Sequence, residues 1–125
     1  MVYLIDTNVI IRFLTGDHEA HLKIATEYFR EIESGKRKAK ILPSVLMETL
    51  FVLTKFYKLP TDEVITDLKK IIALRGIIGD KILLLETLNT IETQNIDFVD
   101  ALICAKSNLY GYGKLSFDED VNKSC

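Results

Sequence analysis

The feature that most constrains the fold is the alternation of short β-forming runs with longer segments of helical periodicity. The chain opens with the apolar run at residues 2–5, and further short runs stand at residues 41–43, 77–78 and 114–117. Helical spacing of apolar residues fills the segments between them. Such alternation is typical of a parallel sheet with helices on both faces. The sequence therefore predicts an α/β fold, a three-layer α/β/α domain around a short, mostly parallel sheet.

The helical segments have recognisable boundaries. Predicted helices cover residues 9–14, about 18–33, 44–58, 61–74, 81–93 and 97–110. Ser44 is an N-cap candidate for the third of these. That helix is apolar around most of its circumference, so we expect it to be buried on more than one side, in the core or against a second subunit.

Composition narrows the class of protein. A chain of 125 residues predicts one domain spanning residues 1–125, and 48% apolar residues with two prolines indicate a globular fold. There is neither a span of about 20 apolar residues nor an export signal, so we expect a cytoplasmic protein without a membrane segment.

The net charge of −2 is not typical of a nucleic-acid binder. The basic run at residues 36–40 favours a solvated turn, although it can contact phosphates.

The cysteines and histidines favour structural roles. Cys104 lies in an apolar helical pattern and Cys125 is the last residue of the sequence, which predicts a buried thiol and a frayed end rather than a disulfide. Neither has the paired spacing of a zinc site. His18 and His21 are three residues apart, a spacing compatible with metal binding, but surface helix residues are the favoured interpretation.

Several acids stand where helices begin. Asp6 follows the first apolar run, and either Asp6 or Thr7 can cap the next helix. Asp97 is the expected N-cap of the last predicted helix. Asp100, at the third helical position, forms a near capping box in which its short side chain reaches back poorly. Capping therefore accounts for Asp97 more fully than for Asp100.

Four acids are expected to converge on one edge of the sheet. Asp6 and Asp118 each follow a predicted strand, Asp100 lies in a first helical turn, and Glu48 interrupts an apolar helix. The carboxyl ends of adjacent parallel strands meet at one edge, where ligands collect. Crowded carboxylates need a cation between them. An all-oxygen site suits Mg²⁺ or Mn²⁺, which commonly act on phosphate esters.

Taken together, these motifs resemble a known family. The order Asp6-Thr7-Asn8, Glu48, Asp97-x-x-Asp100-Ala101 and Ser116-Phe117-Asp118 is similar to that of PIN-domain ribonucleases, specifically toxins of the VapC type. The resemblance covers nearly the whole chain. It implies a sheet of four or five strands. Relatives usually continue beyond the last motif into an edge strand, so the fifth strand stays open here, and Ser116 replaces a more usual Thr.

The resemblance also implies site residues and an activity. The expected catalytic and metal-binding residues are Asp6, Glu48, Asp100 and Asp118, and the expected pocket or supporting residues are Thr7, Asn8, Ser44, Asp97, Ser116 and Asp120. The implied activity is that of a Mg²⁺- or Mn²⁺-dependent endoribonuclease on single-stranded RNA, leaving a 5′-phosphate and a 3′-hydroxyl. A homodimer and a cognate antitoxin protein are the implied partners. Arg12 could hold the phosphate, but a solvated helix residue is slightly favoured.

Three other functions compete with this interpretation. A receiver-type phosphoacceptor needs paired acids after the first strand and a late lysine at a strand end. A haloacid-dehalogenase-type phosphatase needs a second acid two residues after Asp6, where Asn8 stands. A catalytically silent PIN fold, acting as a binding module regulated by a protein partner, would keep the fold without turnover. The presence of all four acids argues against the last alternative.

Overall fold

The chain forms two compact units. The structure, a computed structural model, describes the backbone of all 125 residues and every side chain except that of Ser124. The first unit comprises Met1–Gly79 and the second Asp80–Cys125. Each unit is described below by itself. None of the described helices is long and apolar enough to cross a membrane.

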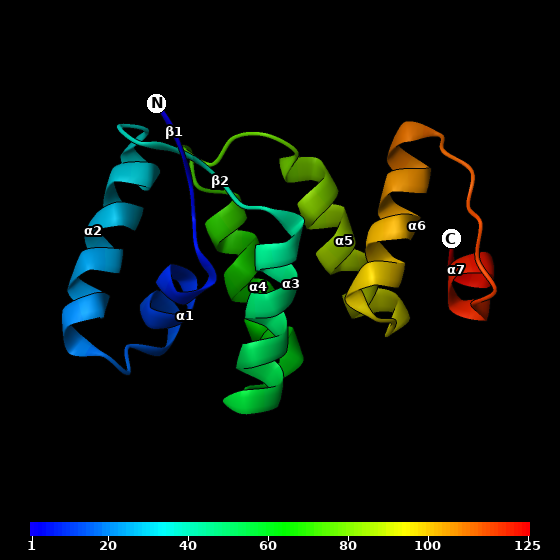
Figure 1. The fold of residues 1–125 in the computed structure, drawn as a ribbon, viewed down its shortest axis with the longest axis horizontal. Helices are drawn as coiled ribbons and strands as arrows, with labels where there is room; N and C mark the ends of the chain where they lie inside the picture. The colour runs from blue at the N-terminus through cyan, green and yellow to red at the C-terminus, as the bar shows by residue number, and fades with distance from the viewer. The chain divides into compact units, whose positions relative to one another are not determined.

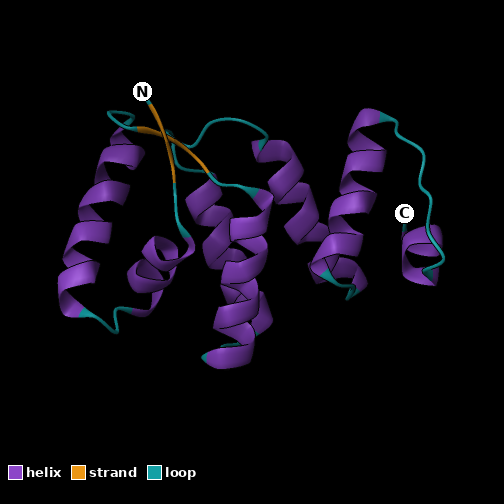
Figure 2. Cartoon of the chain, viewed as in Figure 1, coloured by secondary structure: helices purple, strands orange, loops and turns teal.

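A small parallel sheet organises the first unit. Strand β1 (Val2–Leu4) pairs with β2 (Lys38–Lys40), so that Tyr3 lies opposite Ala39 (Figure 2). A single parallel bridge joins Ala39 to Ile77. Within the described residues the sheet therefore has two strands and one bridge, which is fewer than the four or five strands expected.

The position of the second strand corrects the sequence analysis. The sequence predicts a short second strand that ends near Pro43, and a solvated turn at the basic run of residues 36–40. Instead, Lys38–Lys40 forms the strand, with Ala39 fully buried between two exposed lysines. Only one residue of this strand, Ala39, is buried, and a single buried residue is too short a pattern of alternation to predict a strand from the sequence. Pro43 begins the following helix.

Helices pack around this sheet in the first unit (Figure 1). They are α1 (Thr7–Thr15), α2 (Glu19–Ser34), α3 (Pro43–Phe51), the π-helix η1 (Val52–Phe56) and α4 (Thr61–Ile72). Their apolar faces form a core with the fully buried side chains of Ile10, Leu46, Leu53, Ile65 and Leu68. The predicted helices are confirmed here within a few residues at their ends. The exception is the proposed cap of α3: Leu42 occupies the N-cap position and Pro43 the first turn, so the prediction for Ser44 was wrong.

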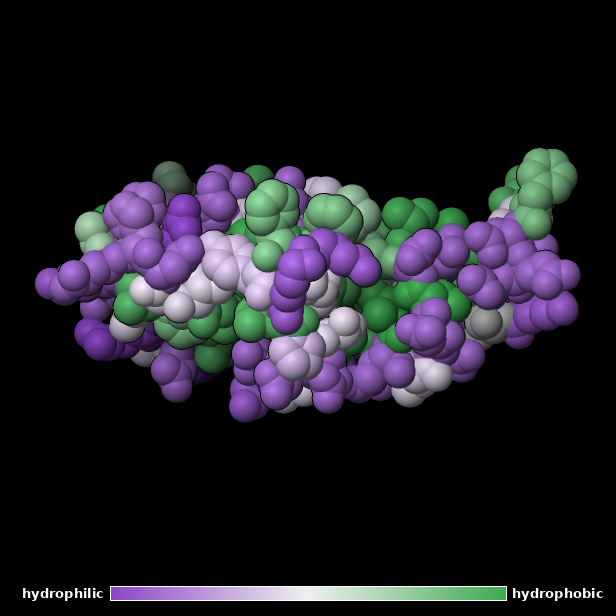
Figure 3. Space-filling view, turned by 90° about the horizontal axis from the view of Figure 1, so that it is seen from below, coloured by the Kyte–Doolittle hydropathy of each residue, from purple (hydrophilic) through white to green (hydrophobic). Residues whose placement is uncertain are grey.

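The second unit is a helical hairpin followed by a short helix. Helix α5 (Lys81–Gln94) ends at Asn95, which adopts the left-handed conformation, and α6 (Phe98–Tyr110) begins after Asp97. Helix α7 (Glu119–Ser124) then packs on α6. The predicted strand at residues 114–117 is irregular instead. Leu115 and Phe117 are fully exposed there, and Figure 3 shows apolar side chains projecting from the part of the chain that carries α6 and α7.

The two cysteines are joined, which contradicts the predicted free thiol. Cys104 of α6 and Cys125 form a disulfide whose Cα atoms lie 5.1 Å apart, within the range that a disulfide spans. Helix α7 carries Cys125 back to α6, and this helix was not predicted from the sequence. Cys104 is buried as expected, but its partner is not at a frayed end.

Candidate metal centre

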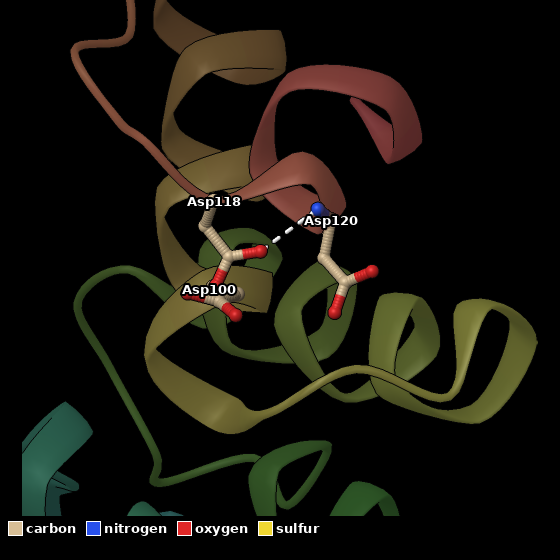
Figure 4. Close-up of side chains that lie close together, drawn as sticks. All are labelled: Asp100, Asp118 and Asp120. Atoms are coloured by element: carbon tan, nitrogen blue, oxygen red, sulfur yellow. Dashed lines mark hydrogen bonds between the residues drawn. The ribbon is translucent and has the colours of Figure 1, made fainter.

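Three carboxylates converge in the second unit. Asp100 lies in the first turn of α6, Asp118 is the N-cap of α7, and Asp120 lies in the first turn of α7. One carboxylate oxygen from each lies within 4.8 Å of the other two (Figure 4). Residues about twenty positions apart are thus gathered at one place where two helices begin.

Local hydrogen bonds fix the segment that presents two of these acids. The Asp118 Oδ1 atom accepts a hydrogen bond from the Asp120 backbone N–H at 2.8 Å, drawn as a dashed line in Figure 4. The Asp118 N–H donates to the Ser116 hydroxyl at 2.9 Å. The Asn122 side-chain amide donates to the Ser116 carbonyl at 3.1 Å. Ser116 therefore shapes the turn that holds Asp118.

Asp100 is the electrostatic centre of the cluster. Burial raises the pKa of its carboxyl above the ordinary value, and the charges of Asp118, Asp97 and Asp120 raise this pKa further. Desolvation and like charges both disfavour a carboxylate, so Asp100 holds a proton more readily than an isolated acid. A divalent cation placed among these oxygens would cancel both effects.

The donor set fits a hard divalent cation. All three groups offer carboxylate oxygens, and the described residues near them contribute no histidine or thiolate donor to the group. Such ligands suit Mg²⁺ or Mn²⁺ rather than zinc. Asp118 and Asp120 are exposed, so they leave room for water and substrate. Asp120 was predicted to be a supporting residue, whereas the structure places it in the cluster itself.

The other predicted acids belong to the first unit. Asp6 is the N-cap of α1, and its Oδ1 accepts a hydrogen bond from the Thr7 N–H at 2.8 Å. Its capping role is therefore confirmed, while its side chain stays exposed. Glu48 is exposed on α3, as is Ser44 one turn earlier. The structure thus assembles Asp100 and Asp118 of the predicted site in the second unit, and Asp6 and Glu48 belong to the first unit.

Thr7, Asn8 and Arg12, which the sequence analysis also singled out, lie in different surroundings. Thr7 is buried, and Asn8 lines a cavity of about 220 Å³ with Arg12, His21 and Tyr28. Arg12 pairs with Asp17 at 2.8 Å. Hydrogen bonds from Tyr57 and from Arg12 hold the pKa of the Asp17 carboxyl well below its usual range. Arg12 is therefore engaged in an ion pair rather than free to meet a phosphate.

The two histidines form a local cap. The His18 Nδ1 atom accepts a hydrogen bond from the His21 N–H at 3.1 Å, and the two rings stack with centroids 3.8 Å apart. His18 is the N-cap of α2. The favoured interpretation, surface helix residues, agrees with this arrangement.

Comparison with known families identifies the fold. Residues 3–124 match the family model of the PIN domain. The chain belongs to the PIN-domain family. PIN domains are generally nucleases, and they typically use divalent metals. The match covers both units. No curated protein and no solved structure gives a significant match.

Membership of the PIN-domain family agrees with the donor chemistry. The acidic cluster on α6 and α7 has the oxygen ligands that a divalent metal requires. From the sequence, Asp120 is expected to be a turn or supporting residue rather than a ligand, and it stands two residues after Asp118. That spacing is the signal by which its place in this PIN domain could have been found.

Proposed function

We propose that this PIN domain is a Mg²⁺- or Mn²⁺-dependent endoribonuclease that hydrolyses single-stranded RNA. The observation that carries the proposal is the convergence of Asp100, Asp118 and Asp120 within 4.8 Å in a member of a family of nucleases. Three carboxylates so close together are costly without a cation. The toxin role in a toxin–antitoxin pair, with a cognate antitoxin as partner, is part of the same proposal and rests on the motif resemblance.

The residues of the proposed site have different roles. As the motif resemblance implies, Asp6, Glu48, Asp100 and Asp118 would hold the metal, and Asp120 lies beside Asp100 and Asp118. A bound Mg²⁺ or Mn²⁺ supplies positive charge for the scissile phosphate and lowers the pKa of water. In the metal-free protein Asp100, whose pKa is raised by burial and by the neighbouring acids, holds a proton more readily than an ordinary aspartate. Hydrolysis would place the phosphate on the 5′ end of one product and leave a 3′-hydroxyl on the other.

Positive charge near Asp6 supports an RNA substrate. Lys38 and Lys40 are exposed on β2, beside β1. The Ile5 N–H donates to the Lys40 carbonyl at 3.2 Å, so this lysine stands next to the end of β1, where Asp6 begins the turn. Lysines in this position would offset the net charge of −2 where an RNA backbone approaches.

The proposal is tested by measuring metal binding and cleavage in matched variants. Asp6→Asn retains an acceptor for the Thr7 N–H, because asparagine is an equally good N-cap. If the four acids serve one centre, Asp6→Asn and Asp118→Asn should each weaken Mn²⁺ binding by roughly tenfold or more. Both variants should abolish cleavage of single-stranded RNA, and EDTA should stop the wild-type reaction.

Glu119→Gln is the control, because Glu119 pairs with Lys123 on the exposed side of α7. It should leave both Mn²⁺ affinity and cleavage unchanged. Wild-type protein that binds Mn²⁺ yet cuts no single-stranded RNA would support the silent binding module instead. Unchanged Mn²⁺ affinity in Asp6→Asn would mean that Asp6 does not bind the metal.

A further inference from the structure

The disulfide lies close to the acidic cluster along both helices. Cys104 follows Asp100 by four residues on α6, so the two lie on the same face one turn apart. Cys125 directly follows α7, whose first turn carries Asp120 and whose N-cap is Asp118. The six residues of α7 span about 9 Å. The bond between Cys104 and Cys125 therefore fastens one end of α7 to α6, and the carboxylates stand at the other end.

Within the described residues, other contacts also hold α7 in place. Val121 is buried, and its carbonyl accepts a hydrogen bond from Lys114 Nζ at 3.2 Å. Cys125 itself packs against a small apolar cluster formed by Ile96, Ala101 and Cys104. A helix of this length has little stability of its own, since nucleation is costly. The position of α7 therefore depends strongly on its attachment to α6.

The acidic cluster opposes that attachment. Asp118 and Asp120 approach Asp100 closely enough for their charges to repel. In metal-free protein this repulsion opposes the contact between the first turn of α7 and α6. The disulfide resists that movement, because it limits how far the chain after Asp118 can separate from α6.

We propose that the Cys104–Cys125 disulfide is a thiol-sensitive positioning element for the metal-binding acids. When it is intact, Asp118 and Asp120 are held beside Asp100 and the cation affinity is high. When it is reduced, α7 leaves α6 and the affinity falls. The expected change in cation affinity rests on the proposed metal site, whereas the expected release of α7 does not depend on a metal.

The redox step requires an external dithiol. Its thiolate attacks one of the two sulfurs, the S–S bond breaks, and a mixed disulfide forms. The second thiol of the reductant resolves that intermediate, so the reductant ends as a disulfide and both cysteines end as thiols. Two electrons and two protons pass from the dithiol to the protein. Intracellular disulfides, where they occur, are commonly transient and redox-sensing, which agrees with such a role.

The test compares the oxidised and reduced forms of the same protein. Wild-type protein is reduced with dithiothreitol, desalted under argon so that no dithiol binds metal, and half of it is reoxidised. Hydrogen exchange in EDTA should show faster exchange at residues 119–124 in the reduced form, with α1 to α4 unchanged. Titration with MnCl₂ should show affinity roughly tenfold or more weaker in the reduced form, and reoxidation should restore both properties.

Cys125→Ser is the matched variant, because it removes the bond and leaves α6 intact. It should behave like reduced wild-type protein and should not respond to dithiothreitol. The wild-type comparison needs no variant, so the test holds even if Cys125→Ser folds poorly. Equal exchange at residues 119–124 in both wild-type forms would overturn the proposal.

Two further outcomes distinguish the proposed role of the disulfide from the proposed metal site. Faster exchange with unchanged Mn²⁺ affinity would overturn the link between the disulfide and the acids, while the proposed metal site would survive. Absence of Mn²⁺ binding in either form would overturn the metal site and the link together, and the exchange data would still decide whether the disulfide holds α7.

Discussion

At the scale of single residues, Asp100 has the most telling environment. Its carboxyl is partly buried and faces Asp118 and Asp120, and its pKa is raised. In the unfolded chain the same group titrates near 3.8. Between that value and the raised pKa, the folded protein binds more protons than the unfolded chain. The stability of metal-free protein should therefore fall as pH rises through this window.

Asp100→Asn removes the loss of stability that comes from ionising the Asp100 carboxyl in the folded, metal-free protein. In EDTA at neutral pH, the variant should melt roughly 2–5 °C above the wild-type protein. The difference should vanish below pH 3.8, where the wild-type carboxyl is protonated in both states. Thermal melts across a pH series measure both effects, and added Mg²⁺ should stabilise the wild-type protein more than the variant. A variant less stable than wild type at neutral pH would show that Asp100 has a structural role that outweighs its repulsion.

At the scale of elements, Gly76 is the point where α2, β2 and the segment of Ile77 meet. Its N–H donates to the Ile32 carbonyl at 2.8 Å, and its carbonyl accepts from the Ala39 N–H at 2.9 Å. A Cβ atom at this position would collide with the backbone carbonyl oxygens of Arg37 and Ile32. Backbone atoms cannot rotate away as a side chain can, so the close approach requires glycine.

Gly76→Ala should therefore lower the free energy of unfolding by about 1–3 kcal/mol, the usual cost of overpacking. Urea denaturation followed by circular dichroism measures it. Gly113→Ala is the matched control, because a Cβ there would meet nothing within 4 Å. Equal stability of the two variants would mean that β2 and the Ile77 segment can separate without cost.

At the scale of the whole molecule, α3 and η1 carry large apolar side chains that are exposed. Phe51 is 58% exposed and Phe56 is 80% exposed, although both are large apolar residues. Phe51 is the last residue of α3 and Phe56 is the last residue of η1. The sequence predicted a homodimer surface on this helix, and we propose that these phenylalanines lie in it.

Phe51→Glu should convert a dimer to a monomer, because a charge at a dimer interface is costly to bury. Light scattering at micromolar concentration measures the mass. Ile82→Glu, at a position 70% exposed on α5, is the matched control and should leave the mass unchanged. A wild-type monomer at that concentration would remove the homodimer from the proposal.

The sequence by itself determined the helices and their local caps. The hydrogen bonds of a helix join residues four apart, so periodicity and capping residues suffice to locate α1, α2, α4, α5 and α6. Asp6 and Asp97 also occupy the N-cap positions expected of them, but of these two side chains only that of Asp6 accepts a capping hydrogen bond. The oxygen-rich set of acids was also visible, because its chemistry is a property of residue types.

Only the tertiary structure decided the strands, the disulfide and the membership of the acidic cluster. A strand satisfies its backbone groups on another segment, so Lys38–Lys40 became a strand by pairing with β1. Residues 114–117 stayed irregular, since the described part of the second unit contains no strand to pair with. The disulfide joins residues 21 positions apart, and Asp120 meets Asp100 through α7. Contacts between distant residues depend on how the chain turns back, and local pattern does not specify that.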